Sequence, residues 1–212
     1  GFVQKIINNS PTYHQRWLIL RSFYLYWYKA PNATEPKEVT PLQIAPLKSN
    51  YVQAVRNECV VLENSKGKEV MFVNDSDWVD ALNNEIAYKR YMEHNFRQGL
   101  VAKPNLVEYF ENEACKSLDV ANEPALYDSQ LPKLLYKSLF FHPKLKELNL
   151  SKTNLRGNLL QDLMDVLIAL KKHSKIEALA LDSNGITKDN IGYICKYLES
   201  ESSFSIKKIS IC

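Results

Sequence analysis

The amino-acid sequence predicts an α+β fold of short strands closed by a helix, then a helical linker, then an α/β solenoid of strand–helix repeats. Three observations predict this order. Short runs of aromatic and β-branched residues alternate with polar turns up to about residue 73, and a helix-period pattern follows. From residue 141, a strand-like motif returns at a nearly constant spacing. We therefore expect three parts, at 1–98, 99–140 and 141–212.

The first part contains the expected strands. They are the short apolar runs "RWLIL", "FYLYWY", "EVTPLQI", "ECVVLEN" and "EVMFV". Polar segments rich in Asn, Ser, Pro, Gly and Lys separate them, and such segments are typical of turns. We expect a meander of six or seven strands.

A helix is predicted directly after these strands. Asp75 or Ser76 is suited to its N-cap. Trp78, Leu82 and Ile86 recur every four residues and so define one apolar face. A curved antiparallel sheet has an open end, and we expect this helix to cover it.

The segment 99–140 contains two further helix-like stretches, "PNLVEYFENEACKSL" and "LPKLLYKSLFF". Pro132 lies where a first helical turn accepts proline. We interpret the segment as a helical linker or cap, packed rather than free because its leucines and Phe110 need burial.

An internal repeat dominates the last part. "LKELNLSKTNL" at 145–155 returns as "IEALALDSNGI" at 176–186, and the start of the motif returns as "IKKISI" at 206–211. We take Asn154 and Asn184 as corresponding residues in the turn that leaves each strand. A strand and a helix every 30 or 31 residues build a solenoid in which each unit covers the next. Because the last strand has no helix after it, we expect the chain to be a fragment of a longer protein.

The composition argues against several classes of protein. A net charge of +3 over 212 residues is too small to indicate nucleic-acid binding. No apolar run is long enough to span a bilayer. The four cysteines are far apart, which is typical of free thiols in a reducing compartment. No catalytic motif and no metal-ligand spacing occurs, so we expect a protein without enzyme activity, without a cofactor and without a metal.

Charge is unevenly distributed within the first part. Residues 1–56 contain seven Lys or Arg and two acids, a net +5, whereas residues 57–98 contain five and eight, a net −3. A domain polarised in this way can orient at an anionic surface.

Residues 1–98 resemble a pleckstrin-homology (PH) domain. Four ordered motifs carry the resemblance: "GFVQK", "QRWLIL", "LYWYKAPNATEPKEVTPLQI" and "DWVDAL". The resemblance implies a PH-type β-barrel or sandwich capped by a C-terminal helix.

In phosphoinositide-binding members of that family, basic residues of the first two strands converge on the inositol phosphates. The resemblance places Lys5 and Arg16 there, with Lys37 and Lys29 as further cations. His14 and Trp27 depart from the family pattern, since the first is largely neutral at pH 7 and the second can only donate through its ring nitrogen. The predicted lipid-phosphate site is therefore partial, which favours weak contact with phosphoinositides or other anionic lipids.

Residues 141–212 resemble leucine-rich repeats (LRR) of the ribonuclease-inhibitor class. A PH domain followed by such repeats is the order found in the CARMIL family, which regulates actin capping. The resemblance implies a cytoplasmic, peripherally membrane-associated adaptor or scaffold, with a protein partner on the concave face of the repeats and no nucleic acid. Two alternatives stay open: a PH-like module used only for protein–protein interaction, and the regulatory N-terminal part of a PH-LRR phosphatase.

Overall fold

The structure is a computed structural model that describes residues 2–6, 13–42, 48–50, 58–64, 67–73, 77–127, 130–170 and 175–212. The chain forms two compact units, unit 1 at Gly1–Lys89 and unit 2 at Arg90–Cys212. The division lies inside a helix, and the segments predicted as 99–140 and 141–212 both belong to unit 2.

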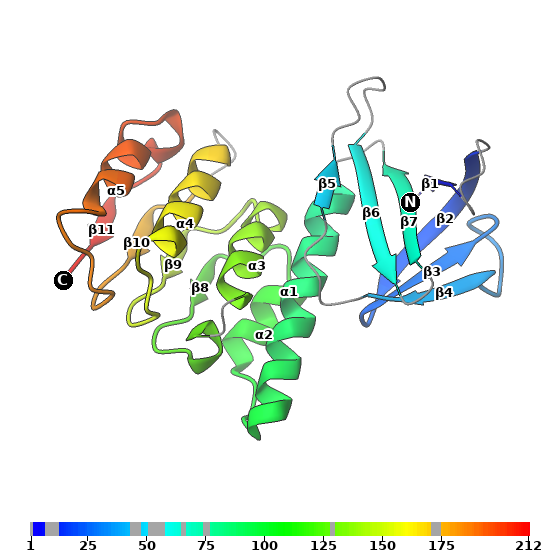
Figure 1. Cartoon of the computed structure of the whole chain (residues 1–212), viewed down its shortest axis with the longest axis horizontal. Helices are drawn as coiled ribbons and strands as arrows, with labels where there is room; N and C mark the ends of the chain where they lie inside the picture. Colours follow the sequence, from blue (N-terminus) through cyan, green and yellow to red (C-terminus); the bar gives the residue numbers. More distant parts are fainter. Residues whose placement is uncertain are drawn as a thin grey trace. The chain divides into compact units, whose positions relative to one another are not determined.

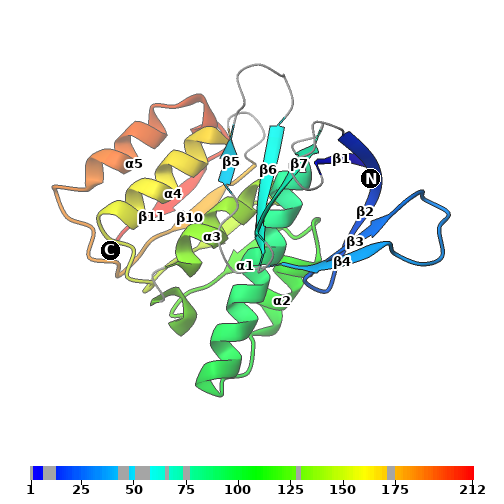
Figure 2. The same cartoon turned by 45° about the vertical axis from the view of Figure 1, so that its right-hand side comes forward.

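Unit 1 is built on one antiparallel sheet of seven strands, with the order β4-β3-β2-β1-β7-β6-β5. The strands are β1 (Phe2–Ile6), β2 (Tyr13–Arg21), β3 (Tyr24–Tyr28), β4 (Glu38–Pro41), β5 (Lys48–Asn50), β6 (Glu58–Asn64) and β7 (Gly67–Val73). β1 therefore lies at the centre, paired with β2 on one side and with β7 on the other. Figure 2 shows β2, β3 and β4 as neighbouring strands.

The predicted β-barrel or sandwich is wrong. In the described part of unit 1, the strands form a single open sheet whose edges are β4 and β5, and no ladder joins these two edges. A barrel requires that ladder, and a sandwich requires two separate sheets.

In unit 1, apolar residues at every second position of the strands form the core. Leu18 lies opposite Trp27, and Leu25 lies opposite Thr40. Leu18, Leu25 and Trp27 are at most 1 % exposed, and Thr40 is buried with them. Residues directly opposite each other share one face of a sheet, so this face of β2, β3 and β4 points to the core.

Helix α1 (Asp77–Gln98) closes unit 1 with its first three turns. The buried Leu82 and Ile86 come from the predicted apolar face. The β2–β3 turn attaches to the helix through Phe23, whose backbone N–H donates to Glu85 Oε1 at 2.8 Å. The Phe23 ring also meets Tyr88 edge-on, with ring centres 5.3 Å apart.

Unit 2 is an α/β arrangement on a parallel sheet with the order β11-β10-β9-β8. Its helices α3, α4 and α5 lie side by side (Figure 1). The elements are α2 (Pro104–Glu111), β8 (Ser117–Asp119), η1 (Pro124–Tyr127), α3 (Leu131–Ser138), η2 (Leu139–Phe141), β9 (Glu147–Asn149), α4 (Asn158–Ala169), β10 (Ala178–Ala180), α5 (Ile191–Leu198), η4 (Glu201–Ser203) and β11 (Lys208–Ser210).

The interpretation of 99–140 as a helical linker is also wrong. Strand β8 lies in this segment and pairs in parallel with β9. The signal was present in the sequence. Cys115, Leu118 and Val120 stand 30 residues before Leu145, Leu148 and Leu150, the apolar residues of the first predicted repeat motif at 145–155. The repeat therefore begins one unit earlier than predicted.

The predicted correspondence of Asn154 and Asn184 is wrong, as the turns after the strands show. Asn122, Lys152 and Ser183 occupy the same place, with φ values of 54°, 55° and 56°. In each case the backbone N–H donates to the next repeat: to Ser151, Asp182 and Cys212 carbonyl oxygens. The residues that follow, Glu123, Thr153 and Asn184, are equivalent and buried. Asn154 instead corresponds to Gly185, at φ values of 57° and 65°.

Candidate functional site

The predicted cations of the first two strands share one face of the sheet in unit 1. Lys5 lies opposite His14 in the β1–β2 register, and Val3 lies opposite Arg16. Residues two apart on one strand also share a face, so Lys5, His14 and Arg16 lie together. Leu18 continues the same series on β2, so this is the face that carries the buried core further along the hairpin.

Trp27 does not belong to a solvent-facing site. Its side chain is 1 % exposed, and its indole N–H donates to Thr40 Oγ1 at 3.0 Å. An indole has a single donor, which Thr40 already accepts. The residue is therefore part of the core and of its hydrogen bonding.

Three predicted cations, Arg16, Lys29 and Lys37, are at least partly exposed to solvent. Arg16 is half-buried, and its Nη1 donates to the backbone carbonyl of Gln15 at 2.9 Å. Lys29 and Lys37 are exposed and lie beside the ends of β3 and β4. The backbone N–H of Lys37 donates to the carbonyl of Trp27 at 2.7 Å, which ties the start of β4 to β3.

Unit 2 presents a second surface, the face of its parallel sheet that alternates with the buried leucines. Two rows cross the four strands in register. They consist of Ser117, Glu147, Ala178 and Lys208, and of Asp119, Asn149, Ala180 and Ser210. The rows are small or polar and at least partly exposed. This face therefore differs from the opposite one, which carries the buried Leu118, Leu148 and Leu179.

Ion pairs line the amino-terminal end of this face. Glu177 Oε2 lies 2.6 Å from Lys207 Nζ, and its Oε1 lies 2.9 Å from Lys146 Nζ. These two hydrogen-bonded ammonium groups, Lys207 first, lower the pKa of Glu177 to about 2. The carboxylate is thus charged and engaged across three successive repeats.

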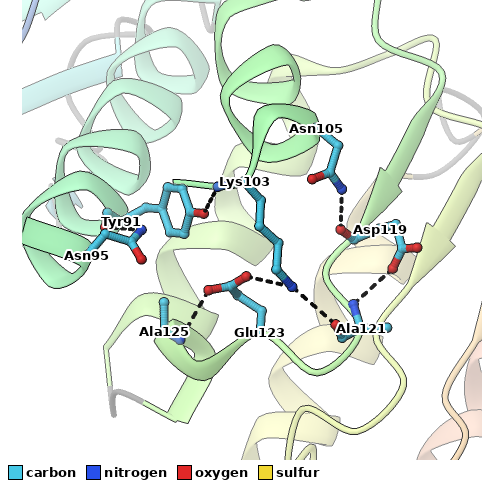
Figure 3. A network of polar contacts seen from close by, with 8 residues as sticks. All are labelled: Tyr91, Asn95, Lys103, Asn105, Asp119, Ala121, Glu123 and Ala125. Atoms are coloured by element: carbon cyan, nitrogen blue, oxygen red, sulfur yellow. Dashed lines mark hydrogen bonds and ion pairs between the residues drawn. The ribbon is translucent and has the colours of Figure 1, made fainter. Parts of the chain in front are cut away.

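A partly buried polar network holds the first repeat of unit 2 (Figure 3). Lys103 Nζ lies 2.9 Å from Glu123 Oε2 and donates to the Ala121 carbonyl at 3.4 Å. The backbone N–H of Lys103 donates to Tyr91 Oη at 2.8 Å. Burial raises the pKa of Tyr91, so its hydroxyl is neutral and accepts this bond. The network joins the last turns of α1, the start of α2 and η1.

Next to this network lies a pocket that sequence reasoning missed. Its volume is about 300 Å³. Pro124 and Tyr127 of η1 form one wall, and α1 forms the other with Arg90, Glu93, His94, Arg97 and Gln98. The signal was the spacing of basic residues in "RYMEHNFR", where positions i, i+4 and i+7 share a helical face.

Comparisons with known proteins do not assign the chain to a family. No protein-family model matches it, and no curated protein matches its sequence. Among the described residues, no helix combines the length and apolarity needed to cross a bilayer. In the same part of the chain, no three His, Cys, Asp or Glu side chains are grouped so as to hold a metal ion.

Proposed function

We propose that the protein is a non-enzymatic adaptor that contacts phosphoinositides or other anionic lipids weakly through unit 1. The polar sheet face of unit 2 would then carry a protein partner. In this role the protein is cytoplasmic and peripherally associated with the membrane. The resemblance of its parts to CARMIL proteins extends the proposal to regulation of the actin cytoskeleton.

The observation that carries the proposal is the β1–β2 register. It brings Lys5, His14 and Arg16 to one face, near the end of the hairpin where β1 and β2 connect. Guanidinium and ammonium groups suit phosphate oxygens, which accept several charge-assisted hydrogen bonds. With Trp27 buried, the proposed lipid contact consists of Lys5, His14 and Arg16, flanked by the exposed Lys29 and Lys37.

Liposome sedimentation of the full chain tests the lipid contact. We expect the chain to sediment with vesicles that contain phosphoinositides at about 0.1 M salt, where exposed charges are screened beyond about 10 Å. The double variant Lys5→Ala/Arg16→Ala should weaken sedimentation roughly 30-fold. This follows from about 1 kcal/mol for each cation at an anionic surface.

The same sheet offers a matched control, Arg21→Ala/Lys68→Ala. Side chains alternate along a strand, so an odd separation places two residues on opposite faces. Arg21 is five residues from Arg16 on β2. Lys68 is three residues from Met71 on β7, and Met71 lies opposite Lys5. Both therefore lie on the other face. The control removes two cations and should retain most of the binding. Equal losses of binding in the two variants would mean that net charge, and not this face, causes the lipid binding. If neither the wild-type chain nor either variant binds the vesicles, the alternative of a module used only for protein–protein interaction is left.

A further inference from the structure

The amino ends of the four parallel strands in unit 2 are rich in lysine. Four equivalent windows end at the first residue of each strand, at 114–117, 144–147, 175–178 and 205–208. Parallel strands start at the same edge of a sheet, so these windows lie side by side. They contain two acids and six exposed lysines, a net +4. We call this part of the surface the lysine edge, after Lys116, Lys144, Lys146, Lys175, Lys207 and Lys208.

The carboxyl ends of the same strands do not share this positive charge. The windows that begin at the last residue of each strand, at 119–122, 149–152, 180–183 and 210–212, contain two aspartates and one lysine. Their net charge is −1, against +4 at the lysine edge. The sheet is therefore polarised along its strands, and a negatively charged ligand is attracted to one end of it.

Stabilisation of the sheet accounts for only two of the six lysines. Lys146 Nζ and Lys207 Nζ lie 2.9 and 2.6 Å from the carboxylate oxygens of Glu177. Within the described ranges of the chain, no ion pair engages the ammonium groups of the other four, which are Lys116, Lys144, Lys175 and Lys208.

The lysines are also neighbours of one another. The backbone N–H of Lys146 donates to the carbonyl of Lys116 at 2.8 Å, which places two like charges in adjacent repeats. Like charges on neighbouring strands repel and so lower the stability of the sheet. A bound anion would remove this repulsion.

Glu177 shows how a carboxylate binds at this edge, because it is held between lysines of the preceding and the following repeat. Neighbouring strands are about 4.8 Å apart, so the distance from β8 to β11 is about 14 Å. An extended peptide spans this distance with four or five residues, at about 3.3 Å each. Short side chains beside the lysines, those of Ser117 and Ala178, let a peptide backbone approach the sheet.

We propose that the lysine edge binds an extended acidic peptide segment of a partner protein, whose carboxylates pair with Lys116, Lys144, Lys175 and Lys208. Glu147 and Glu177 lie among the lysines. This mixture suits a ligand with spaced negative charges better than a uniformly anionic membrane surface. The proposal rests on the proposed partner role of the sheet face in unit 2, for which it names the partner's chemistry. It does not depend on the lipid contact of unit 1.

Fluorescence polarisation of labelled peptides with the full chain tests the proposal. The probes are a peptide of four Glu-Ser repeats and a neutral peptide of four Gln-Ser repeats. We expect the acidic peptide to bind about tenfold more tightly than the neutral one at about 0.1 M salt, because several exposed ion pairs form.

The variant Lys144→Gln/Lys175→Gln should weaken binding of the acidic peptide roughly fivefold, since each exposed ion pair contributes little. Lys152→Gln/Lys188→Gln is the matched control. It removes the same charge from two exposed lysines of unit 2 that lie outside the lysine edge, and it should leave the affinity within about twofold of the wild type.

A third variant guards against misfolding, because it should bind more tightly. Glu147 is exposed and lies in the same cross-strand row as Lys208. Glu147→Gln removes a repelling charge and should strengthen binding of the acidic peptide about twofold. A misfolded chain cannot produce such a gain.

Vesicle sedimentation separates this proposal from the lipid contact of unit 1. Lys144→Gln/Lys175→Gln should sediment with phosphoinositide vesicles as the wild type does. If this variant loses as much sedimentation as Lys5→Ala/Arg16→Ala, the lysine edge is a lipid contact and the peptide proposal is overturned. Equal binding of the two peptides, or equal losses in the Lys144/Lys175 variant and its control, would also overturn it. A chain that binds vesicles but neither peptide would refute this proposal and leave the lipid contact standing.

Discussion

His142 illustrates how one buried side chain makes unit 2 sensitive to pH. It is 2 % exposed and stacks on the Tyr109 ring at a centroid distance of 3.9 Å. Burial lowers its pKa from the usual 6.5 to about 4, and a hydrogen bond with the Asn112 backbone opposes the shift. The folded protein therefore holds a neutral imidazole at pH values where an unfolded chain would protonate it.

We predict that unit 2 loses stability as the pH falls from about 6.5 to about 4. In this window the unfolded state binds a proton that the folded state does not, so the free energy of unfolding rises with pH. The shift corresponds to a loss on the order of 3 kcal/mol at the acid end. Urea denaturation followed at the β9 amide signals, at pH 7, 6, 5 and 4, measures it.

The variant His142→Phe keeps an aromatic ring beside Tyr109 but cannot take up a proton. Its stability should change much less with pH between 6.5 and 4 than that of the wild type. If both proteins lose stability equally in this window, other groups cause the acid sensitivity.

Asn184 is the residue that most directly ties one repeat to the next. It is 1 % exposed. Its Oδ1 accepts from the backbone N–H groups of Thr153 at 2.9 Å and Leu155 at 3.1 Å. Its Nδ2 donates to the carbonyls of Leu150 at 2.8 Å and Leu181 at 3.0 Å. The amide thus satisfies backbone groups in two turns at once.

Replacing Asn184 by Ala should lower the free energy of unfolding of unit 2 by about 3 kcal/mol, since it leaves two buried N–H groups without this acceptor. Asn154→Gly is the matched control, because Asn154 is exposed and the equivalent position in the next repeat is Gly185. Chemical denaturation should show the control within about 0.5 kcal/mol of the wild type. Equal destabilisation by both substitutions would contradict the role assigned to Asn184.

At the scale of elements, one ion pair connects the start of α2 with η1. Glu123 is buried, whereas the side chain of Lys103 is 41 % exposed. A buried carboxylate is stable only while its partner is present. The pair therefore holds the start of η1, and η1 forms one wall of a pocket with α1.

Lys103→Met should destabilise unit 2 by about 3 kcal/mol, because it leaves Glu123 charged and unpaired in the interior. Adding Glu123→Gln in the same chain should recover most of that loss, because the buried charge is gone. A double-mutant cycle from denaturant unfolding gives the coupling energy. Strictly additive losses would show that the two side chains act independently.

Helix α1 contributes residues to the cores of both units. Leu82 and Ile86 belong to the core of unit 1, and Tyr91 belongs to the core of unit 2. At 100° per residue, Tyr91 is rotated by about 140° from Ile86 around the helix axis. The four-residue period that predicts the helix therefore breaks at Tyr91, which is close to where the two units divide.

At the scale of the whole molecule, burial depends on which repeat a residue belongs to, and not only on its residue type or its position within the repeat. Leu167 of α4 is 0 % exposed, yet Leu198 at the same place in α5 is 46 % exposed. Leu150 and Leu181 are buried, whereas the equivalent Ile211 is 37 % exposed. Each strand and helix of this parallel sheet is covered by its neighbours, so the same apolar residue is a core residue in one repeat and a surface residue in another.

The sequence alone determined the local structure. Strand alternation, helical periodicity and turn residues each depend on residues that are close together in the sequence. It predicted the strands of the first 73 residues, the helix that begins at Asp77 and the 30- or 31-residue repeat. It also predicted Lys5 and Arg16 on two adjacent antiparallel strands, and the register of β1 and β2 places the two residues on one face of the sheet.

Only the tertiary structure decided what depends on residues distant in sequence. It left the sheet of unit 1 open, buried Trp27 against Thr40, paired Lys103 with Glu123 and set Arg90, His94 and Arg97 beside η1. Strand order, burial and the charge around a pocket arise from contacts between separate segments. A periodic pattern in one segment carries no information about which other segment will cover it.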